Sequence, residues 1–140
     1  IRTAWEDSDV FDTPIAADIS GDIFDQETGF NNNGSAMTSF IQTGYFNGDE
    51  SGDQVFFMDR IIPDTTFAAG NTIKTEINTK KYPNDTNVTT KGPFSITSTQ
   101  GKLDFRSRGR AFQVKIFSDA VDTQWRLGTW RVRGQPDGTR

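Results

Sequence analysis

The sequence predicts an all-β protein, an antiparallel β-sandwich or barrel of about six to eight strands that follows an irregular acidic N-terminal arm. Apolar and polar residues alternate with the two-residue period of a half-buried strand, and no helical period is sustained along the 140 residues. Runs rich in aromatic and β-branched residues also recur at short intervals, with turn-forming residues between them. These two observations favour a sheet protein over a helical one.

Residues 1–34 are predicted to be an N-terminal connection. This segment is polar and acidic, and only residues 15–19 and 21–25 are typical of short strands. The Asn-Asn-Asn-Gly run at residues 31–34 predicts a turn, because asparagine and glycine tolerate left-handed backbone conformations. We therefore expect the antiparallel β domain to occupy residues 35–140.

Seven segments of this domain are predicted to be strands. The clearest lies in NTIKTEINTKKYP, where isoleucine and threonine alternate with charged and amide residues, so that one face is buried. The seven segments are Met37–Phe46, Gln54–Ile62, Ile73–Thr79, Pro93–Ser98, Lys102–Ser107, Arg110–Ser118 and Trp125–Arg133.

The connections between these strands suggest their pairing. The loop NGDESGD (residues 47–53) predicts one long hairpin over residues 37–62, because its two glycines permit the positive φ values of tight turns. Residues 118–124 predict a second hairpin loop. Pro63 is expected to end its strand, and residues 80–93 form a longer polar connection.

The chain has no histidine and no cysteine, which excludes histidine-based triads, histidine or thiolate zinc sites and disulfides. Carboxylates remain, in WEDSDVFD (residues 5–12) and NGDESGD. We interpret the first group as solvated loop acids, since it lacks a helper motif. The second is interpreted as a turn, since it lacks the ligand order of a calcium loop. The predictions are no enzyme, no cofactor, no metal site and, without a long apolar run, no membrane-spanning segment.

Arginines gather near the C-terminus. Residues 1–100 carry fifteen acids and six bases, whereas residues 101–140 carry four acids and nine bases. In RSRGRAFQVKIF, arginines 106, 108 and 110 share parity with the apolar residues 112, 114 and 116, so a bulge at Gly109 is expected to re-aim the chain. In WRLGTWRVRG, a bulge at Gly128 would turn Trp125, Leu127, Trp130 and Val132 inward and the three arginines outward.

These arginines are the candidate site residues. They could pair with carboxylates of the same or a neighbouring subunit, line a channel for DNA through phosphate contacts, or face water. The candidate intersubunit or DNA-channel contacts are Arg106, Arg108, Arg110, Arg126, Arg131 and Arg133.

Three stretches together resemble a known family. They are ETGFNNNGSAMTSFIQTGYFNGDESGDQVFFMDRIIPD, KKYPNDTNVTTKGPFSI and RSRGRAFQVKIFSDAVDTQWRLGTWRVRGQPDGTR, which span residues 27–140. In the order and content of their motifs they are similar to the C-terminal part of a tail structural protein of short-tailed bacteriophages. This is the tail nozzle, or tail tubular protein B-like, class, whose members contain a β-propeller.

The resemblance implies a virion structural protein in the phage tail that acts in tail assembly and genome passage, without catalytic residues or cofactor. It also implies a homo-oligomeric ring, expected to be a hexamer, with other phage tail proteins as partners and transient, non-specific contact with viral DNA. Residues 1–34 would then be the end of a preceding propeller blade. The alternative is a phage receptor- or glycan-binding tip domain.

Overall fold

The protein is all-β, as predicted. The structure, a computed structural model, describes residues 1–7 and 9–138, which form strands and loops without any helix. Accordingly, no helix of the described residues is long and apolar enough to cross a membrane.

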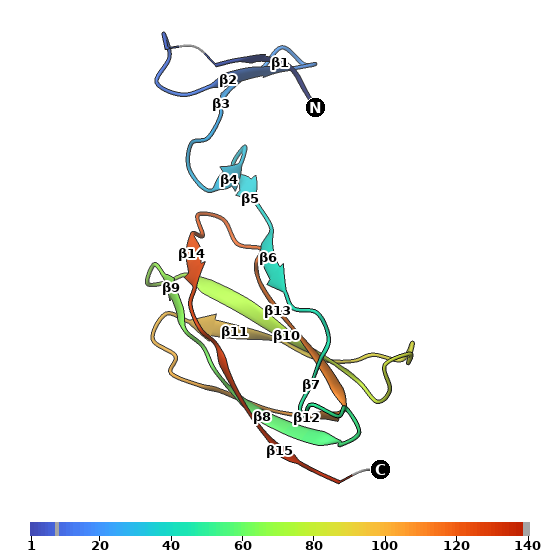
Figure 1. The fold of residues 1–140 in the computed structure, drawn as a ribbon. Helices are drawn as coiled ribbons and strands as arrows, with labels where there is room; N and C mark the ends of the chain where they lie inside the picture. The colour runs from blue at the N-terminus through green and yellow to red at the C-terminus, as the bar shows by residue number, and fades with distance from the viewer. Residues whose placement is uncertain (8, 139–140) are drawn as a thin grey trace.

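Two antiparallel sheets form the body of the molecule (Figure 1). The first has the order β11-β10-β13-β6, and the short strand β7 pairs with the other end of β13. The second has the order β12-β8-β15. The strands of the first sheet are β6 (Ser39–Gln42), β7 (Phe46–Asn47), β10 (Thr72–Lys80), β11 (Thr89–Thr97) and β13 (Ala111–Ser118); those of the second are β8 (Phe56–Ile62), β12 (Leu103–Gly109) and β15 (Arg131–Pro136).

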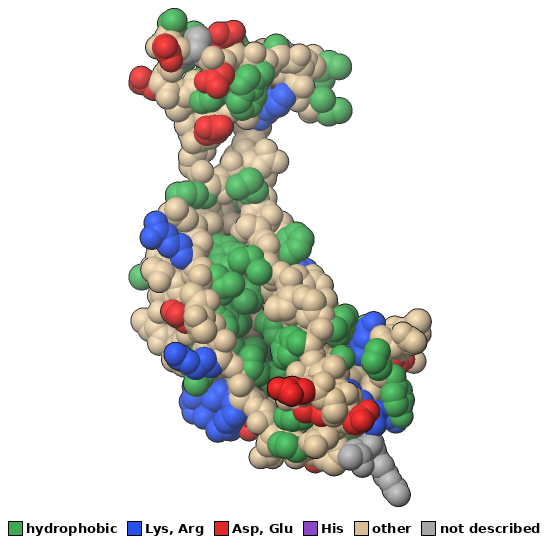
Figure 2. Space-filling model, viewed as in Figure 1, with side chains coloured by type: hydrophobic (Ala, Val, Ile, Leu, Met, Phe, Trp, Pro, Cys, Tyr) green, Lys and Arg blue, Asp and Glu red, His purple; other side chains and the backbone are tan. Residues whose placement is uncertain are grey.

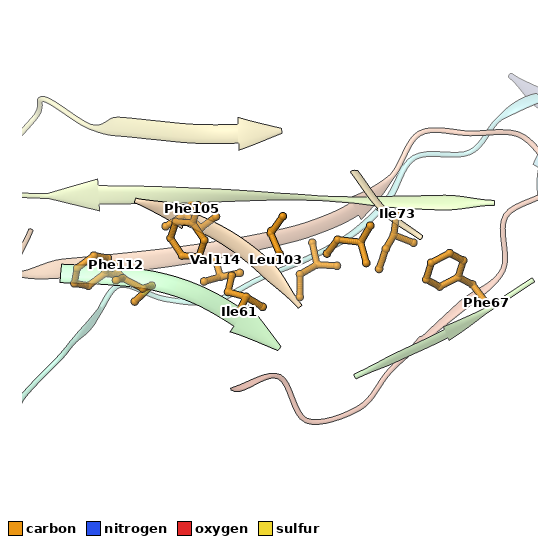
Figure 3. Packing of buried hydrophobic residues seen from close by; sticks show 11 residues of the cluster. Ile61, Phe67, Ile73, Leu103, Phe105, Phe112 and Val114 are labelled. Atoms are coloured by element: carbon orange, nitrogen blue, oxygen red, sulfur yellow. The ribbon is translucent and has the colours of Figure 1, made fainter. Parts of the chain in front are cut away.

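The core lies between these two sheets, as in a β-sandwich (Figure 3). Its side chains come from the inner faces of both sheets and from β9 (Thr65–Phe67). Phe112 and Ile77 of the first sheet and Ile61 of the second are fully buried. The buried cluster consists of Met58, Ile61, Phe67, Ile73, Ile77, Ile96, Leu103, Phe105, Phe112, Val114 and Ile116.

Strand β10 confirms the alternation that the sequence predicts. Ile73, Thr75, Ile77 and Thr79 are buried, whereas the intervening side chains are only half-buried. The buried Thr79 hydroxyl shares a 2.5 Å hydrogen bond with that of Ser107 across the two sheets. A two-residue period therefore identified the inner face correctly.

Both predicted hairpins are wrong. Residues 37–62 do not fold back on themselves, because β6 and β7 pair with β13 whereas β8 pairs with β12 and β15 in the other sheet. Likewise residues 118–124 lead from β13 to β14 (Trp125–Leu127), which pairs with β9. In both places the chain crosses between sheets, which lets each strand bury its apolar face in the shared core.

The N-terminal region is less irregular than expected. Strands β1 (Arg2–Glu6), β2 (Ile15–Asp18) and β3 (Ile23–Asp25) form a three-stranded antiparallel sheet, which stands off from the sandwich (Figure 1). The sequence predicted β2 and β3 but not β1. Below, we call residues 1–25 the N-terminal sheet.

A short hairpin links the N-terminal sheet to the sandwich. It consists of β4 (Asn31–Asn32) and β5 (Ser35–Ala36), joined by Asn33 and Gly34. Both turn residues have positive φ, 49° and 77°, as a two-residue hairpin turn of type I′ requires. The predicted turn is thus confirmed, and the domain boundary placed at residue 34 falls inside it.

Candidate interaction face

The outer face of the β12-β8-β15 sheet brings most of the candidate arginines together. Along β12 the odd-numbered residues are buried, so Arg106 and Arg108 project to the opposite, solvent side. On β15, Arg133 is paired in register with Arg60 of β8, and Arg131 with Ile62. We call this surface the basic face; it is made by Arg60, Arg106, Arg108, Arg131 and Arg133 together with Asp59, Asp104 and Asp137.

Two ion pairs allow Arg133 and Arg60 to lie opposite each other. Arg133 donates two hydrogen bonds to the carboxylate of Asp59, from Nε at 2.8 Å and from Nη2 at 2.6 Å. Arg60 donates from Nε to Asp104 Oδ1 at 2.5 Å. Each guanidinium therefore has its own carboxylate, which offsets the repulsion between them.

A break in strand register positions Asp59. The β8–β15 register shifts between Arg133 and Gly134, which are partners of Arg60 and Met58, so Asp59 has no ladder partner on β15. Such a bulge re-aims a side chain, here toward Arg133. The hydrogen bonds and positive charge of Arg133 hold the pKa of Asp59 below its ordinary value. In turn, the hydrogen-bonded carboxylate of Asp59 raises the pKa of Arg133. Similarly, the hydrogen bond from Arg60 lowers the pKa of Asp104.

Arg108 ties the C-terminal segment to the sheet. Its Nε donates to the Asp137 carboxylate, and its Nη2 donates to the Asp137 carbonyl at 3.1 Å. The backbone of the same segment also bonds to Val55, through Asp137 N–H to Val55 O and Val55 N–H to Gly138 O, both at 2.7 Å. This arginine therefore stabilises the position of Asp137 beside the sheet.

Three of the candidate arginines have no carboxylate neighbour among the described residues. Arg106 and Arg131 lie exposed on the basic face, and Arg126 lies exposed on β14. Each lies more than 4.0 Å from every carboxylate oxygen of residues 1–7 and 9–138. Figure 2 shows basic side chains along the left edge of the sandwich in this view, the edge on which β14 lies. These charges are available to a partner.

Arg110 does not belong to this face. It is half-buried where the chain crosses between the sheets, and it donates to the carbonyls of Asp53 at 3.0 Å and Lys81 at 3.3 Å. Its guanidinium lies 4.8 Å from the centre of the Tyr82 ring. The shared parity of arginines 106, 108 and 110 therefore gives no continuous stripe.

The even-numbered side chains of β12, before Gly109, point to solvent and those of β13, after it, point to the core, as predicted, but the cause differs from the one expected. Strands β12 and β13 belong to different sheets, so the chain turns a corner there and the bulge predicted within one strand is absent. A Cβ at Gly109 would lie 2.2 Å from Thr79 Cγ2 and 2.8 Å from Lys80 O. Glycine thus allows the two sheets to approach at the corner.

Most side chains of residues 125–133 point in the predicted direction, with apolar residues inward and arginines outward. Trp125, Leu127 and Trp130 pack against the core, and the neighbouring arginines point outward. Val132 is paired with Ile61 on the inner side, but it remains 39% exposed because β15 is an edge strand. At Gly128, as at Gly109, the predicted bulge is absent. The side-chain direction changes there because the chain crosses from the β14–β9 pair to β15 in another sheet.

Positive and negative charges are divided between the two parts of the chain. Residues 1–34 carry eight acids and one base, a net charge of −7, whereas residues 35–140 carry eleven acids and fourteen bases, a net charge of +3. Each of the six ion pairs found among the described residues joins two surface side chains of residues 35–138. The acids of the N-terminal region are therefore not neutralised by the arginines of the same described chain.

The acids considered for catalysis or calcium binding are not gathered into a site. No group of three or more acidic residues in the described chain is arranged to hold a metal ion. Within NGDESGD, the Ser51 hydroxyl donates to Asp49, and the Asp53 N–H donates to the Ser51 oxygen at 3.3 Å. These bonds are those of a folded polar loop.

Sequence reasoning missed the carboxylates that pair with the arginines. Asp104 shares the outward parity of Arg106 and Arg108, so alternation could have placed it on their face. Asp59 could not have been found in this way, because its orientation depends on a bulge. Comparison with known proteins gives no further guidance, since no family model and no curated protein matches the chain.

Proposed function

We propose that this chain is a structural domain of a bacteriophage tail, a nozzle or tube component that acts in tail assembly and genome passage. In this proposal it forms part of a homo-oligomeric ring in the virion, in contact with other tail proteins. The resemblance over residues 27–140 supports the proposal, and the all-β sandwich is a suitable scaffold for it.

The basic face is the observation that carries the proposal. Arg106 and Arg131 project from a hydrogen-bonded sheet, and carboxylate pairs hold their neighbours Arg60 and Arg133 in place. Guanidinium groups fixed in this way can bind carboxylates of an adjacent subunit or phosphates of passing DNA. Such a surface fits a role in assembly.

The test is to purify particles of the phage that encodes the chain and to determine their structure by cryo-electron microscopy. We expect the domain in a symmetric ring of the tail, with the basic face against a neighbouring subunit or against DNA in the channel. Absence of the chain from purified particles, or basic faces that meet only solvent, would contradict the proposal.

A glycan-binding measurement distinguishes the proposed structural role from the alternative, a receptor- or glycan-binding tip domain. A receptor- or glycan-binding tip domain would bind host-surface glycans as an isolated chain and would occupy a fibre or tip position in the particle. That combination of results would replace the proposed role with the alternative one.

A further inference from the structure

The N-terminal sheet leaves its apolar side chains uncovered. Ile23 is 72% exposed and lies on the same face of the sheet as Glu6 and Asp25. Ile19, in the connection between β2 and β3, is 85% exposed. On the opposite face, Trp5 is 54% exposed and is paired with the buried Ala16. Small sheets gain stability mainly by packing an apolar face against another element. This sheet therefore has apolar surface that a second molecule can cover.

Charge defines the kind of surface that fits it. The N-terminal region has a net charge of −7, and none of its described acids lies within 4.0 Å of a basic nitrogen of the described chain. The basic face carries five arginines against three aspartates, and Ile62 lies on it, 40% exposed and paired with Arg131. The two surfaces are complementary in charge, and both offer apolar contact.

The linking hairpin keeps these surfaces of one molecule apart. Asn31 donates from Nδ2 to Asp122 Oδ1 at 2.6 Å, and Asp122 donates its N–H to Asn31 Oδ1 at 2.7 Å. Asn71 Nδ2 adds a third bond, to the Asp122 carbonyl at 3.0 Å. The hairpin is thus held against one end of the sandwich, with the N-terminal sheet beyond that end and β15 leading toward the other (Figure 1).

We propose that the N-terminal sheet of one copy docks on the basic face of a second copy of this chain. The interface rests on the proposed role of the chain as a self-assembling structural domain, and it names the two surfaces that meet. Because two different patches come together, the contact is head-to-tail, and such contacts close into a ring or extend into a filament.

The test uses two charge-reversal variants of the 140-residue chain. The face variant carries Arg106→Glu and Arg131→Glu and keeps a normal N-terminal sheet; the sheet variant carries Glu6→Lys, Asp9→Lys and Asp25→Lys and keeps a normal face. Their size is measured by analytical ultracentrifugation over a concentration series. None of these side chains has an ion-pair partner among the described residues.

We expect the natural chain to associate at low salt and to dissociate as salt rises, since the Debye length falls from about 10 Å at 0.1 M to about 3 Å at 1 M. Each variant alone should bind itself at least about tenfold more weakly. An equimolar mixture of the two should recover association, because the intact sheet of one variant meets the intact face of the other and the two reversed surfaces are again opposite in charge. A control variant, Lys91→Glu, should associate like the natural chain.

A natural chain that stays monomeric at low salt would overturn the proposal, as would variants that associate as strongly as the natural chain. A mixture of the two variants that stays monomeric would also overturn the proposal, because the intact sheet of one variant can dock on the intact face of the other in that mixture. Failure of the phage assignment gives a different result, since the chain would then be absent from particles while the mixture of variants still associated.

Discussion

Arg133 and Asp59 bind each other across the β15–β8 ladder through two hydrogen bonds, at 2.8 Å and 2.6 Å. This geometry favours the ionised form of the carboxyl group, so its pKa is lowered. A lowered pKa means that the native state binds this proton less tightly than the unfolded chain does. The pair therefore stabilises the fold above the unfolded pKa, and the stabilisation is lost as pH falls through the lowered, folded pKa.

The first prediction concerns Arg133→Gln. The pKa of Asp59 should rise toward its ordinary value, because the main cause of its lowering is removed. The variant should lose stability at neutral pH, and the loss should vanish in acid, where the carboxyl group is protonated. Carboxyl-carbon NMR titration measures the pKa, and urea unfolding at several pH values measures the stability. Arg126→Gln is the control; an equal loss for both variants at neutral pH would contradict the assignment.

Substitution of Gly109 tests the corner between the two sheets. Gly109→Ala should destabilise the fold by about 1–3 kcal/mol, because the new Cβ must displace Thr79 and the Lys80 carbonyl. The Cβ would lie 2.8 Å from that carbonyl oxygen, which belongs to the backbone and cannot swing away. Gly101→Ala is the matched control, since a Cβ there meets no atom within 4 Å. Thermal or urea unfolding compares them, and equal stability of the two variants would be inconsistent with a close approach at Gly109.

Substitution by alanine should destabilise the fold far more at the buried Phe112 than at the exposed Phe40. Phe112 is fully buried between the sheets, so Phe112→Ala should cost about 3–5 kcal/mol through lost burial and the cavity left behind. Phe40 is 61% exposed, and Phe40→Ala should change the free energy of unfolding by about 0.5 kcal/mol or less. Urea unfolding of both variants measures the two losses in the free energy of unfolding. A comparable cost for Phe40 would show that its side chain is covered in solution.

The linking hairpin predicts a change in motion more than in stability. Asn31→Ala removes both side-chain hydrogen bonds to Asp122, so the N-terminal sheet should move more freely relative to the sandwich. Nitrogen-15 relaxation should show lower order parameters for residues 1–25 than in the natural chain, with the sandwich unchanged. Asn32→Ala is the control, because Asn32 pairs with Ser35 through the β4–β5 ladder alone. Identical relaxation in both variants would mean that Asn31 does not position the sheet.

Local rules were sufficient for several elements. Alternation identified the buried side of β10, and the Asn33–Gly34 pair identified a hairpin turn, because both signals depend on a few adjacent residues. The inward facing of Trp125 and Trp130 also followed from spacing and a glycine. Strand pairing did not follow, because residues 37–62 read as a hairpin locally but cross to another sheet in the fold.

For the candidate site, composition and alternation predict that arginines concentrate near the C-terminus and that Arg106, Arg131 and Arg133 face away from the core. Three further features became visible in the folded chain: Arg133 meets Asp59, Arg110 leaves the basic face, and the N-terminal acids have no ion pair within the described chain. These features depend on residues that are far apart along the chain. The period of two sets which side of a strand is buried, whereas the choice of neighbouring strand depends on the packing of two whole sheets.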